Sequence, residues 1–237
     1  MVPTPKPYII EHRIQTTHNV IVFNLEPQEG DVFDFRPGQF VMVALYGQDG
    51  QPLPKAKPYS VCSSPLKKSQ LQIAFKIQGE FTNTLAQLKA GDRVGISGPF
   101  GVFTYDEKKM TEAVFLAGGI GITPFVSMFR YATGKQLSNS LTLLFANQTP
   151  EDIVFLEDLQ LLDKQNPHFT AHFVVERPEA DWQGETGRVN KAMLEKYCQP
   201  VMGKYFFVCG PDGFIIAMTE ILKGLSVDAE HIKVEKF

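Results

Sequence analysis

Three closely spaced glycines near the middle of the chain form the strongest local motif. Gly118, Gly119 and Gly121 follow an apolar run, and Thr123 and Pro124 come directly after them. Glycine lets a backbone turn tightly beside a ligand, and Thr followed by Pro is favoured where a helix begins. The free N–H groups of such a helix end can hold a diphosphate. The spacing G-x-G-x-x-P differs from the usual G-x-G-x-x-G, so a strand–helix turn without a ligand is the alternative.

Four further segments stand out in the sequence. In chain order they are Lys57-Pro58-Tyr59-Ser60, Gly79-Glu80-Phe81-Thr82, Cys209-Gly210-Pro211 and Val234-Glu235-Lys236-Phe237. Each also has an ordinary structural explanation. Ser60 would be a serine at a strand edge, Thr82 a helix cap and Cys209 a buried core cysteine, while Phe237 would be a frayed chain end.

Short strand-like runs separated by Gly, Pro and Asp fill the chain up to about Tyr105. The clearest runs are Val20–Leu25, Gln39–Leu45, Leu71–Ile77 and Arg93–Ser97, and one short helix follows Thr82. Lys57–Ser60 is expected at the end of a Pro-rich loop. Many short strands with regular turns predict a small antiparallel barrel or sandwich.

Strand and helix patterns alternate from Ala113 onward. Strands are expected at Ala113–Ala117, Leu141–Phe145, Phe169–Val175, Tyr205–Cys209 and His231–Val234, and helices at Pro124–Thr133, Phe155–Leu162, Lys191–Tyr197 and Phe214–Leu222. This alternation predicts a five-stranded parallel sheet with helices on both faces. A charged stretch at Asp106–Lys109 marks the boundary, which gives one domain over residues 1–107 and a second over 108–237.

The order of these motifs resembles that of the ferredoxin–NADP reductase superfamily, in particular the flavin and NAD(P) module of bacterial oxygenase reductases. The resemblance covers nearly the whole chain. It implies an N-terminal Greek-key flavin-binding β-barrel and a C-terminal nucleotide-binding α/β domain. It also implies FAD, with FMN as the alternative, and NADH or NADPH. The C-x4-C-x2-C run of a plant-type [2Fe–2S] cluster is missing, so the electron acceptor is expected outside this chain.

On the flavin side, the resemblance implies that Tyr59 stacks along the isoalloxazine and that Ser60 offers its hydroxyl to flavin N5. Lys57 stands before Pro58 where the family usually has Arg, so a bidentate phosphate contact is lost. Gly79 to Thr82, with Phe81 between them, are expected at the flavin phosphate. Lys76 is either a second phosphate contact or a solvated lysine at a strand edge.

On the nicotinamide side, the resemblance implies that the glycine turn holds the diphosphate, from Gly118 through Thr123 and Pro124. Cys209, Gly210 and Pro211 are expected beside the site of hydride transfer. The closing Glu-x-Phe implies that Glu235 lies near flavin N5 and that Phe237 covers the flavin face. Ser60, Cys209 and Glu235 are therefore the candidate catalytic residues.

The choice of nicotinamide cofactor depends on the loop after the second strand of the nucleotide domain. A 2′-phosphate needs basic residues there. The loop Ala146–Asp152 has no Lys or Arg and carries two acids, Glu151 and Asp152. NADH is therefore the preferred cofactor, although Arg188 is basic and can reach the same place from elsewhere in the chain.

Composition excludes several other classes. The 237 residues are 43% hydrophobic and 21% charged, with a net charge of −3, which gives no electrostatic reason to expect nucleic acid or an anionic membrane. Three cysteines do not make a secreted disulfide framework, and no signal peptide or membrane span is evident. No Gly-x-Ser-x-Gly elbow indicates a hydrolase, and the scattered histidines predict no metal site.

We therefore expect a cytoplasmic, flavin-dependent NAD(P)H oxidoreductase that passes electrons to a ferredoxin, an oxygenase component or another partner subunit. Two alternatives stay open from the sequence. One is a free-flavin or quinone reductase that binds its flavin transiently. The other is a non-catalytic redox-sensing subunit that binds the same cofactors.

Overall fold

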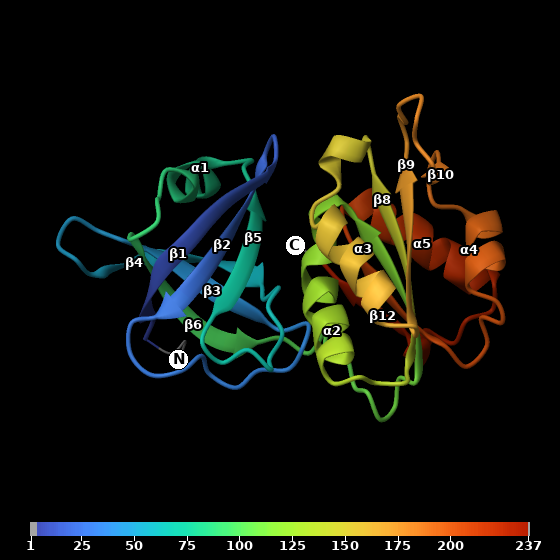
Figure 1. The fold of residues 1–237 in the computed structure, drawn as a ribbon, viewed down its shortest axis with the longest axis horizontal. Helices are drawn as coiled ribbons and strands as arrows, with labels where there is room; N and C mark the ends of the chain where they lie inside the picture. The colour runs from blue at the N-terminus through green and yellow to red at the C-terminus, as the bar shows by residue number, and fades with distance from the viewer. Residues whose placement is uncertain (1–3, 237) are drawn as a thin grey trace. The chain divides into compact units, whose positions relative to one another are not determined.

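The computed structural model describes residues 4–236 and divides into two compact units (Figure 1). The first unit comprises the chain up to Thr104 together with Thr123–Tyr131. The second comprises Tyr105–Ile122 and the chain from Ala132 onward. Each unit has a sheet of its own.

Six antiparallel strands form the sheet of the first unit. They are β1 (Lys6–Thr17), β2 (Val20–Pro27), β3 (Phe40–Tyr46), β4 (Pro52–Ser60), β5 (Leu71–Lys76) and β6 (Arg93–Phe100). Their order is β4-β3-β6-β1-β2-β5. A bridge between Val61 and Ile73 joins the two ends of this order, so the sheet curls into the predicted antiparallel barrel. Alternate strand residues fill its core, where the rings of Phe23 and Phe75 meet edge to face at 5.1 Å.

The segment expected to be a Pro-rich loop is a strand. Pro52, Pro54 and Pro58 all lie in β4, which pairs with β3. β4 stands at one end of the strand order, and proline is tolerated on such edge strands because one side of the strand makes no ladder hydrogen bonds. The expectation of a loop was therefore wrong, and Tyr59 and Ser60 are held by strand pairing.

Six parallel strands form the sheet of the second unit. They are β7 (Glu112–Gly118), β8 (Ser140–Asn147), β9 (Phe169–Val175), β10 (Glu185–Thr186), β11 (Tyr205–Cys209) and β12 (Ile232–Glu235), in the order β10-β9-β8-β7-β11-β12. Five of these strands match the predicted ones. The sixth, β10, has two residues and pairs with Val174 and Val175 of β9, which is too short to leave a hydrophobic pattern in the sequence.

Helices cover both faces of this parallel sheet. Leu194 of α4 (Lys191–Tyr197) and Met218 of α5 (Asp212–Gly224) share a core with Leu116 of β7, while α3 (Leu156–Gln165) covers the opposite face (Figure 1). The chain runs outward from β7 to β8 on one side and places β11 on the other. Ligands of open α/β sheets bind at the carboxyl ends of strands where the order reverses in this way.

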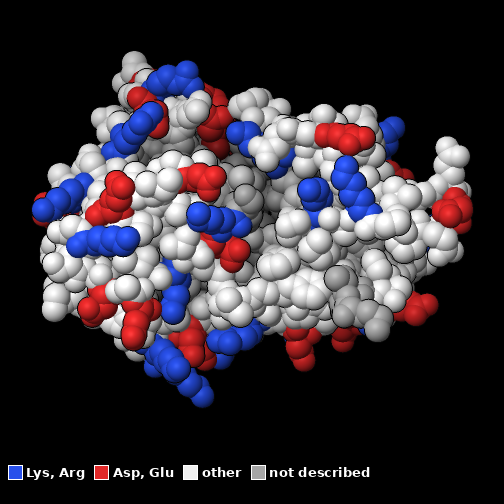
Figure 2. Space-filling model, turned by 180° about the vertical axis from the view of Figure 1, so that it is seen from behind, with Lys and Arg blue, Asp and Glu red and all other residues white. Residues whose placement is uncertain are grey.

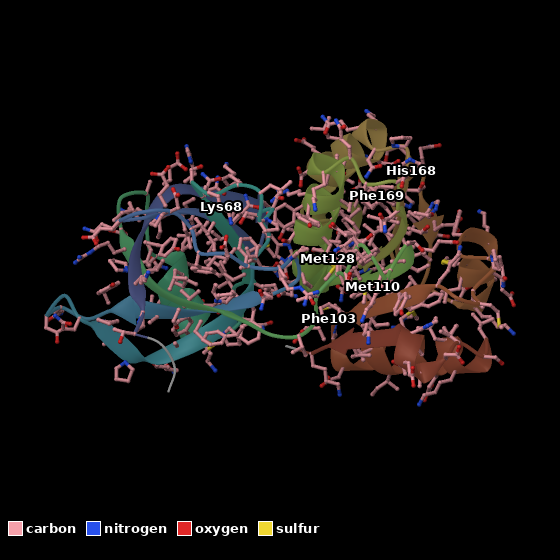
Figure 3. All side chains as sticks on the ribbon, turned by 90° about the horizontal axis from the view of Figure 1, so that it is seen from below. Lys68, Phe103, Met110, Met128, His168 and Phe169 are labelled. Atoms are coloured by element: carbon pink, nitrogen blue, oxygen red, sulfur yellow. The ribbon has the colours of Figure 1, made fainter. Side chains whose placement is uncertain are left out.

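Helix α2 (Thr123–Gly134) begins directly after the short 3-10 helix η1 (Gly119–Ile122). Its residues Thr123–Tyr131 belong to the first unit. Phe103 and Met128, both labelled in Figure 3, are buried, and the ring of Phe103 lies 5.9 Å from that of Phe125. Aromatic packing thus attaches this part of α2 to the barrel.

The face of the molecule seen in Figure 2 carries no large patch of one charge. On the face drawn in Figure 2, Lys and Arg side chains are interspersed with Asp and Glu. Within residues 4–236, no helix is both long enough and apolar enough to cross a membrane.

Candidate functional site

Two motifs that lie about twenty residues apart in the sequence meet on the barrel. The ring of Tyr59 on β4 stacks at 6.5 Å against that of Phe81 on α1 (Glu80–Ala86), with an angle of 23° between the ring planes. Lys55 and Glu80 form an ion pair at 3.3 Å between the same two elements. Burial raises the pKa of the Tyr59 hydroxyl to about 12, so this ring stays neutral and presents a flat, largely apolar surface.

Ser60 is the most buried residue of the Lys57–Ser60 motif. It is 4% exposed and pairs with Phe40 of β3. Lys57, two residues before Tyr59, is exposed. A buried hydroxyl beside a half-buried aromatic ring, with a cation nearby on the same strand, is a donor set that fits a planar heterocycle carrying a phosphate.

The segment before and inside α1 is arranged around the hydroxyl of Thr82. This hydroxyl accepts hydrogen bonds from the backbone N–H groups of Gln78 at 3.0 Å and Gly79 at 3.1 Å, and it donates to the Gly79 carbonyl. The residue at the helix cap is therefore Gly79, and Thr82, the third helical residue, accepts a hydrogen bond from the Gly79 N–H through its hydroxyl. Thr82 is not the cap that the sequence suggested. Lys76, the last residue of β5, is exposed.

The glycine turn of the second unit leaves open space beside its backbone. Gly119 has φ +53°, and a Cβ built on it would meet nothing within 4 Å among the described atoms. Gly121 is the opposite case, because a Cβ there would lie 2.4 Å from the Cys209 carbonyl oxygen and 2.7 Å from the Cα of Gly210. The turn can therefore present N–H groups outward only because it packs directly on the Cys209–Pro211 segment.

Three strands bring the nucleotide-side motifs to one edge of the sheet. Ala117 at the end of β7 pairs with Cys209 on β11, and Cys209 in turn pairs with Glu235 on β12. The pattern of parallel strands alone would place these ends together. The structure therefore brings together the glycine turn, Cys209-Gly210-Pro211 and Glu235 as the sequence implied.

Burial controls the protonation of Cys209 and Glu235. The Cys209 thiol is fully buried, and burial, with a smaller contribution from the nearby Glu235 carboxylate, raises its pKa far above the ordinary range. Burial also raises the pKa of Glu235. Cys209 is therefore a neutral thiol at physiological pH, which does not suit a thiolate nucleophile.

Asn147, at the carboxyl end of β8, was not recognised from the sequence as a candidate site residue. It is 7% exposed, and neither its Oδ1 nor its Nδ2 finds a hydrogen-bond partner within the described part of the chain. Its neighbour Ala146 pairs with Gly118 of the glycine turn. A buried amide without partners is costly, and such orphaned groups at the carboxyl edge of a parallel sheet fit a site that receives a polar ligand.

The loop after β8 lies against residues from the end of β9. The backbone N–H of Glu176 donates to the Asn147 carbonyl at 3.1 Å, and the Arg177 guanidinium donates to the Gln148 side chain at 2.8 Å. Arg188 forms an ion pair with Glu176 at 3.1 Å. Glu176 and Arg177 were missed because they are far from this loop in sequence. Arg188 pairs with Glu176, whose backbone N–H donates to the Asn147 carbonyl of this loop.

Phe237 lies outside the described residues, so its expected place over a flavin stays a prediction. Among residues 4–236, no three His, Cys, Asp or Glu side chains are grouped as a metal site would require. Cys62, Cys198 and Cys209 are all buried.

Comparison with known families agrees with both units. A model of the oxidoreductase FAD-binding domain matches residues 7–105, and a model of the oxidoreductase NAD-binding domain matches residues 115–220. The chain is 30% identical over 230 residues to the glycine betaine monooxygenase reductase subunit of Chromohalobacter salexigens, covering 94% of this chain and 62% of that protein. It is 28% identical over 228 residues to NADH-cytochrome b5 reductase 1 of Aspergillus fumigatus, covering 92% and 74%.

Solved structures show the same fold. The FAD/NAD-binding domain of nitric oxide dioxygenase from Vibrio cholerae superposes with a TM-score of 0.88 at 23% identity and 99% coverage of both chains. The ferredoxin–NADP reductase of Neisseria gonorrhoeae gives a TM-score of 0.82 at 20% identity, covering 99% of each chain. The chain therefore consists of an oxidoreductase FAD-binding domain followed by an oxidoreductase NAD-binding domain, shares the fold of the ferredoxin–NADP reductases, and has FAD and NAD(P)H as its cofactors.

Proposed function

We propose that the chain accepts hydride from NADH and delivers electrons to a separate acceptor protein, such as a ferredoxin or an oxygenase component. The observation that carries this proposal is that each cofactor motif belongs to an assembled half-site. Tyr59 and Phe81 stack on the barrel, while Ala117, Cys209 and Glu235 share one edge of the parallel sheet. Relatives named as the reductase subunits of a glycine betaine monooxygenase and of a stachydrine N-demethylase support a protein acceptor.

The residues of the barrel hold and orient the flavin in this proposal. A bound flavin supplies the conversion of two-electron to one-electron chemistry. Tyr59 gives the ring a stacking surface, and the buried Ser60 hydroxyl donates toward N5. Lys57, Pro58, Lys76 and the Gly79–Thr82 turn, with Phe81 inside it, face the phosphate end. Since the Thr82 hydroxyl already accepts from two backbone N–H groups, its role there is to shape the turn.

The residues of the nucleotide domain hold the dinucleotide. Backbone N–H groups between Gly118 and Thr123, followed by Pro124 in the first turn of α2, face the diphosphate. Gly210 and Pro211 would leave room for the nicotinamide next to Cys209. The neutral Cys209 thiol would form one side of this nicotinamide site. Glu235 would contribute a carboxyl group near the nicotinamide. Phe237, which lies outside the described residues, would cover the flavin as the resemblance implies.

The experiment that tests this function is anaerobic mixing of the purified yellow protein with NADH. Rapid loss of the visible flavin absorbance, followed by its return on adding an oxidised ferredoxin, is the expected result. Mass spectrometry of the released cofactor decides between FAD and FMN. A flavin that stays oxidised would overturn the proposal and favour a redox-sensing subunit.

A free-flavin or quinone reductase is the second candidate within the same chemistry. Such an enzyme releases its flavin between turnovers, whereas the stacked Tyr59 and the buried Ser60 favour a retained cofactor. Dialysis separates the two, because flavin lost at low protein concentration together with fast reduction of added riboflavin would favour the rival.

The preference for NADH is supported by the charges around the loop after β8. Glu151 and Glu179 lie close enough for each to influence the other, and the neighbouring Glu151 raises the pKa of Glu179. Arg188 is paired with Glu176, and Arg177 donates to Gln148. A 2′-phosphate would meet acidic groups and two engaged guanidinium groups. We expect kcat/KM for NADH to exceed that for NADPH by at least about tenfold, and the double variant Glu151→Gln with Glu179→Gln to narrow this ratio.

We also propose that the charged stretch divides the chain into a flavin domain over 1–107 and a nucleotide domain over 108–237, with Thr123–Tyr131 of the latter packed into the first compact unit, and that the protein works in the cytoplasm. Expression of a reporter fusion, followed by fractionation, tests the second statement.

A further inference from the structure

The barrel is closed at a segment that follows the flavin motif immediately. After Ser60, Val61 bridges to Ile73 of β5, and the Cys62 N–H donates to the Gln72 carbonyl at 2.7 Å. The Gln72 N–H donates in return to the Ser63 hydroxyl at 3.0 Å. We call Val61–Ser63 the closure segment, because it joins the two ends of the strand order.

Helix α2 donates to the closure segment at two carbonyl groups. The Arg130 guanidinium donates to the Cys62 carbonyl at 2.9 Å, and the Ser127 hydroxyl donates to the Ser63 carbonyl at 2.7 Å. Ser127 is fully buried and Arg130 is partly buried. These contacts lie within the first unit, to which Thr123–Tyr131 belongs. A charged donor on a shielded carbonyl makes a stronger and more directional hydrogen bond than a neutral donor does.

Arg130 also donates a hydrogen bond to strand β5 of the barrel. The same Nη1 atom lies 2.7 Å from the Gln72 side-chain oxygen, and the Gln72 amide group donates to Asn24 of β2 at 2.7 Å. The guanidinium therefore fixes β5 and the closure segment with one group. Both hydrogen bonds come from one nitrogen of the planar guanidinium, a geometry that the compact ammonium group of lysine does not reproduce.

The position of Ser60 depends on this network because only one residue separates it from Cys62. The Ser60 carbonyl accepts a weak hydrogen bond from the Cys62 thiol at 3.7 Å. If the closure segment shifts, the backbone of Ser60 and Tyr59 shifts with it. A displacement of about 1 Å at a reacting centre can slow a reaction by about a hundredfold.

We propose that Arg130, assisted by Ser127, is a positioning residue for hydride transfer: it fixes the closure segment and so sets the Ser60 hydroxyl against the flavin. The inference rests on the proposed function, since it assigns Ser60 to the flavin. Helix α2 begins at Thr123, directly after the glycine turn, so one helix serves the diphosphate with its first turn and the flavin motif with its third.

The test compares Arg130→Met with Arg93→Met. Arg93 is an exposed barrel arginine whose guanidinium lies over the Tyr46 ring at 5.0 Å, so its loss removes the same charge from the same unit. In flavin-free protein, hydrogen exchange at the Val61 and Cys62 amides should accelerate about tenfold or more in Arg130→Met and stay unchanged in Arg93→Met. Equal exchange in the two variants would overturn the proposal.

The flavin-loaded proteins supply the second readout. We expect Arg130→Met to keep its flavin, to change the shape of the visible circular dichroism of the flavin, and to lower the limiting rate of reduction by about tenfold or more. The Kd for NADH should stay within about twofold. Arg130→Lys should recover part of the rate. An unchanged limiting rate, or a rate loss explained wholly by lost flavin, would overturn the proposal.

Two further arms keep the result decisive. If Arg130→Met does not fold, Ser127→Ala carries the same expectations with smaller changes, and its failure to alter either exchange or rate would overturn the proposal. If wild-type protein is not reduced by NADH, the proposed function fails by itself, and the exchange comparison in flavin-free protein then decides whether Arg130 fixes the closure segment.

Discussion

The two units of the molecule carry opposite net charges. The first, the barrel with Thr123–Tyr131, has 11 Lys and Arg against 8 Asp and Glu, whereas the second has 12 against 18. The unit proposed to bind an anionic dinucleotide is thus the acidic one. Long-range attraction does not explain its binding, so local donors must do so, and the glycine turn supplies backbone N–H groups at short range.

The two half-sites also differ in what they are made of. The barrel half consists of side chains: the stacked rings of Tyr59 and Phe81 and the buried hydroxyl of Ser60. The nucleotide half consists largely of close backbone contacts, with Gly121 against Cys209 and Gly118 against Gly210. The first half should therefore be sensitive to the removal of atoms and the second to their addition.

The largest effect should come from adding one carbon at Gly121. In Gly121→Ala, the new Cβ would lie 2.4 Å from a backbone carbonyl oxygen that cannot move aside, and we expect a loss of about 3 kcal/mol in the free energy of unfolding, together with loss of NADH binding. Urea unfolding and NADH titration measure the two effects.

Gly213→Ala is the control, because a Cβ there meets nothing within 4 Å in the described chain. This variant should be stabilised by about 0.5 kcal/mol. Equal stability in the two variants would contradict the contrast.

The next effect should come from removing one oxygen from the barrel half. Ser60→Ala should lower the limiting rate of flavin reduction by about tenfold or more with little change in stability or in the Kd for NADH. Stopped-flow absorbance measures the rate. Ser97→Ala is a matched control, since Ser97 is also 4% exposed and its hydroxyl has no partner among residues 4–236. The flavin of Ser97→Ala should be reduced by NADH as fast as that of the wild type. The same slowing in both variants would show that losing any buried serine hydroxyl of the barrel lowers the rate of flavin reduction.

A smaller effect should appear in the pH dependence of stability. Burial raises the pKa of Glu235, so the folded state holds the proton at this residue more tightly than the unfolded state does. The resulting stabilisation is complete below the ordinary pKa of Glu and is lost as pH rises through the raised value. Urea unfolding between about pH 4 and about pH 7 should show Glu235→Gln gaining stability relative to wild type as pH rises. Parallel pH profiles would mean that Glu235 does not titrate differently on folding.

The smallest effect should be an opposite response of the two units to salt. Raising ionic strength screens attraction to the basic barrel and repulsion from the acidic nucleotide unit. With ferricyanide as an anionic acceptor, reoxidation of the reduced protein should slow by about two- to threefold, while the Kd for NADH stays constant or falls slightly. Weaker NADH binding at high salt would show that side-chain cations, not backbone N–H groups, dominate that site.

The second unit was the easier one to predict from sequence. Its strands are apolar and its helices are periodic, so five of its strands were predicted from pattern, while the sites of Cys209 and Glu235 came from the resemblance to a family. The barrel was harder, because the prolines of β4 suggested a loop and the two-sided exposure of β1 left no clean alternation. Asn147, Glu176 and Arg130 were missed since their roles arise from contacts with residues far away in the chain, which no local pattern records.

The membership of Thr123–Tyr131 in the first unit has a consequence for protein engineering. A chimera made by joining one reductase's residues up to 107 to another's nucleotide domain would pair a closure segment with a foreign α2. The residues of the foreign helix at the positions of Arg130 and Ser127 would then face closure-segment carbonyl groups from a different reductase. A chimera that takes both the barrel and α2 from the same reductase needs two separate replaced segments. Such a chimera should retain activity where one joined at a single position fails.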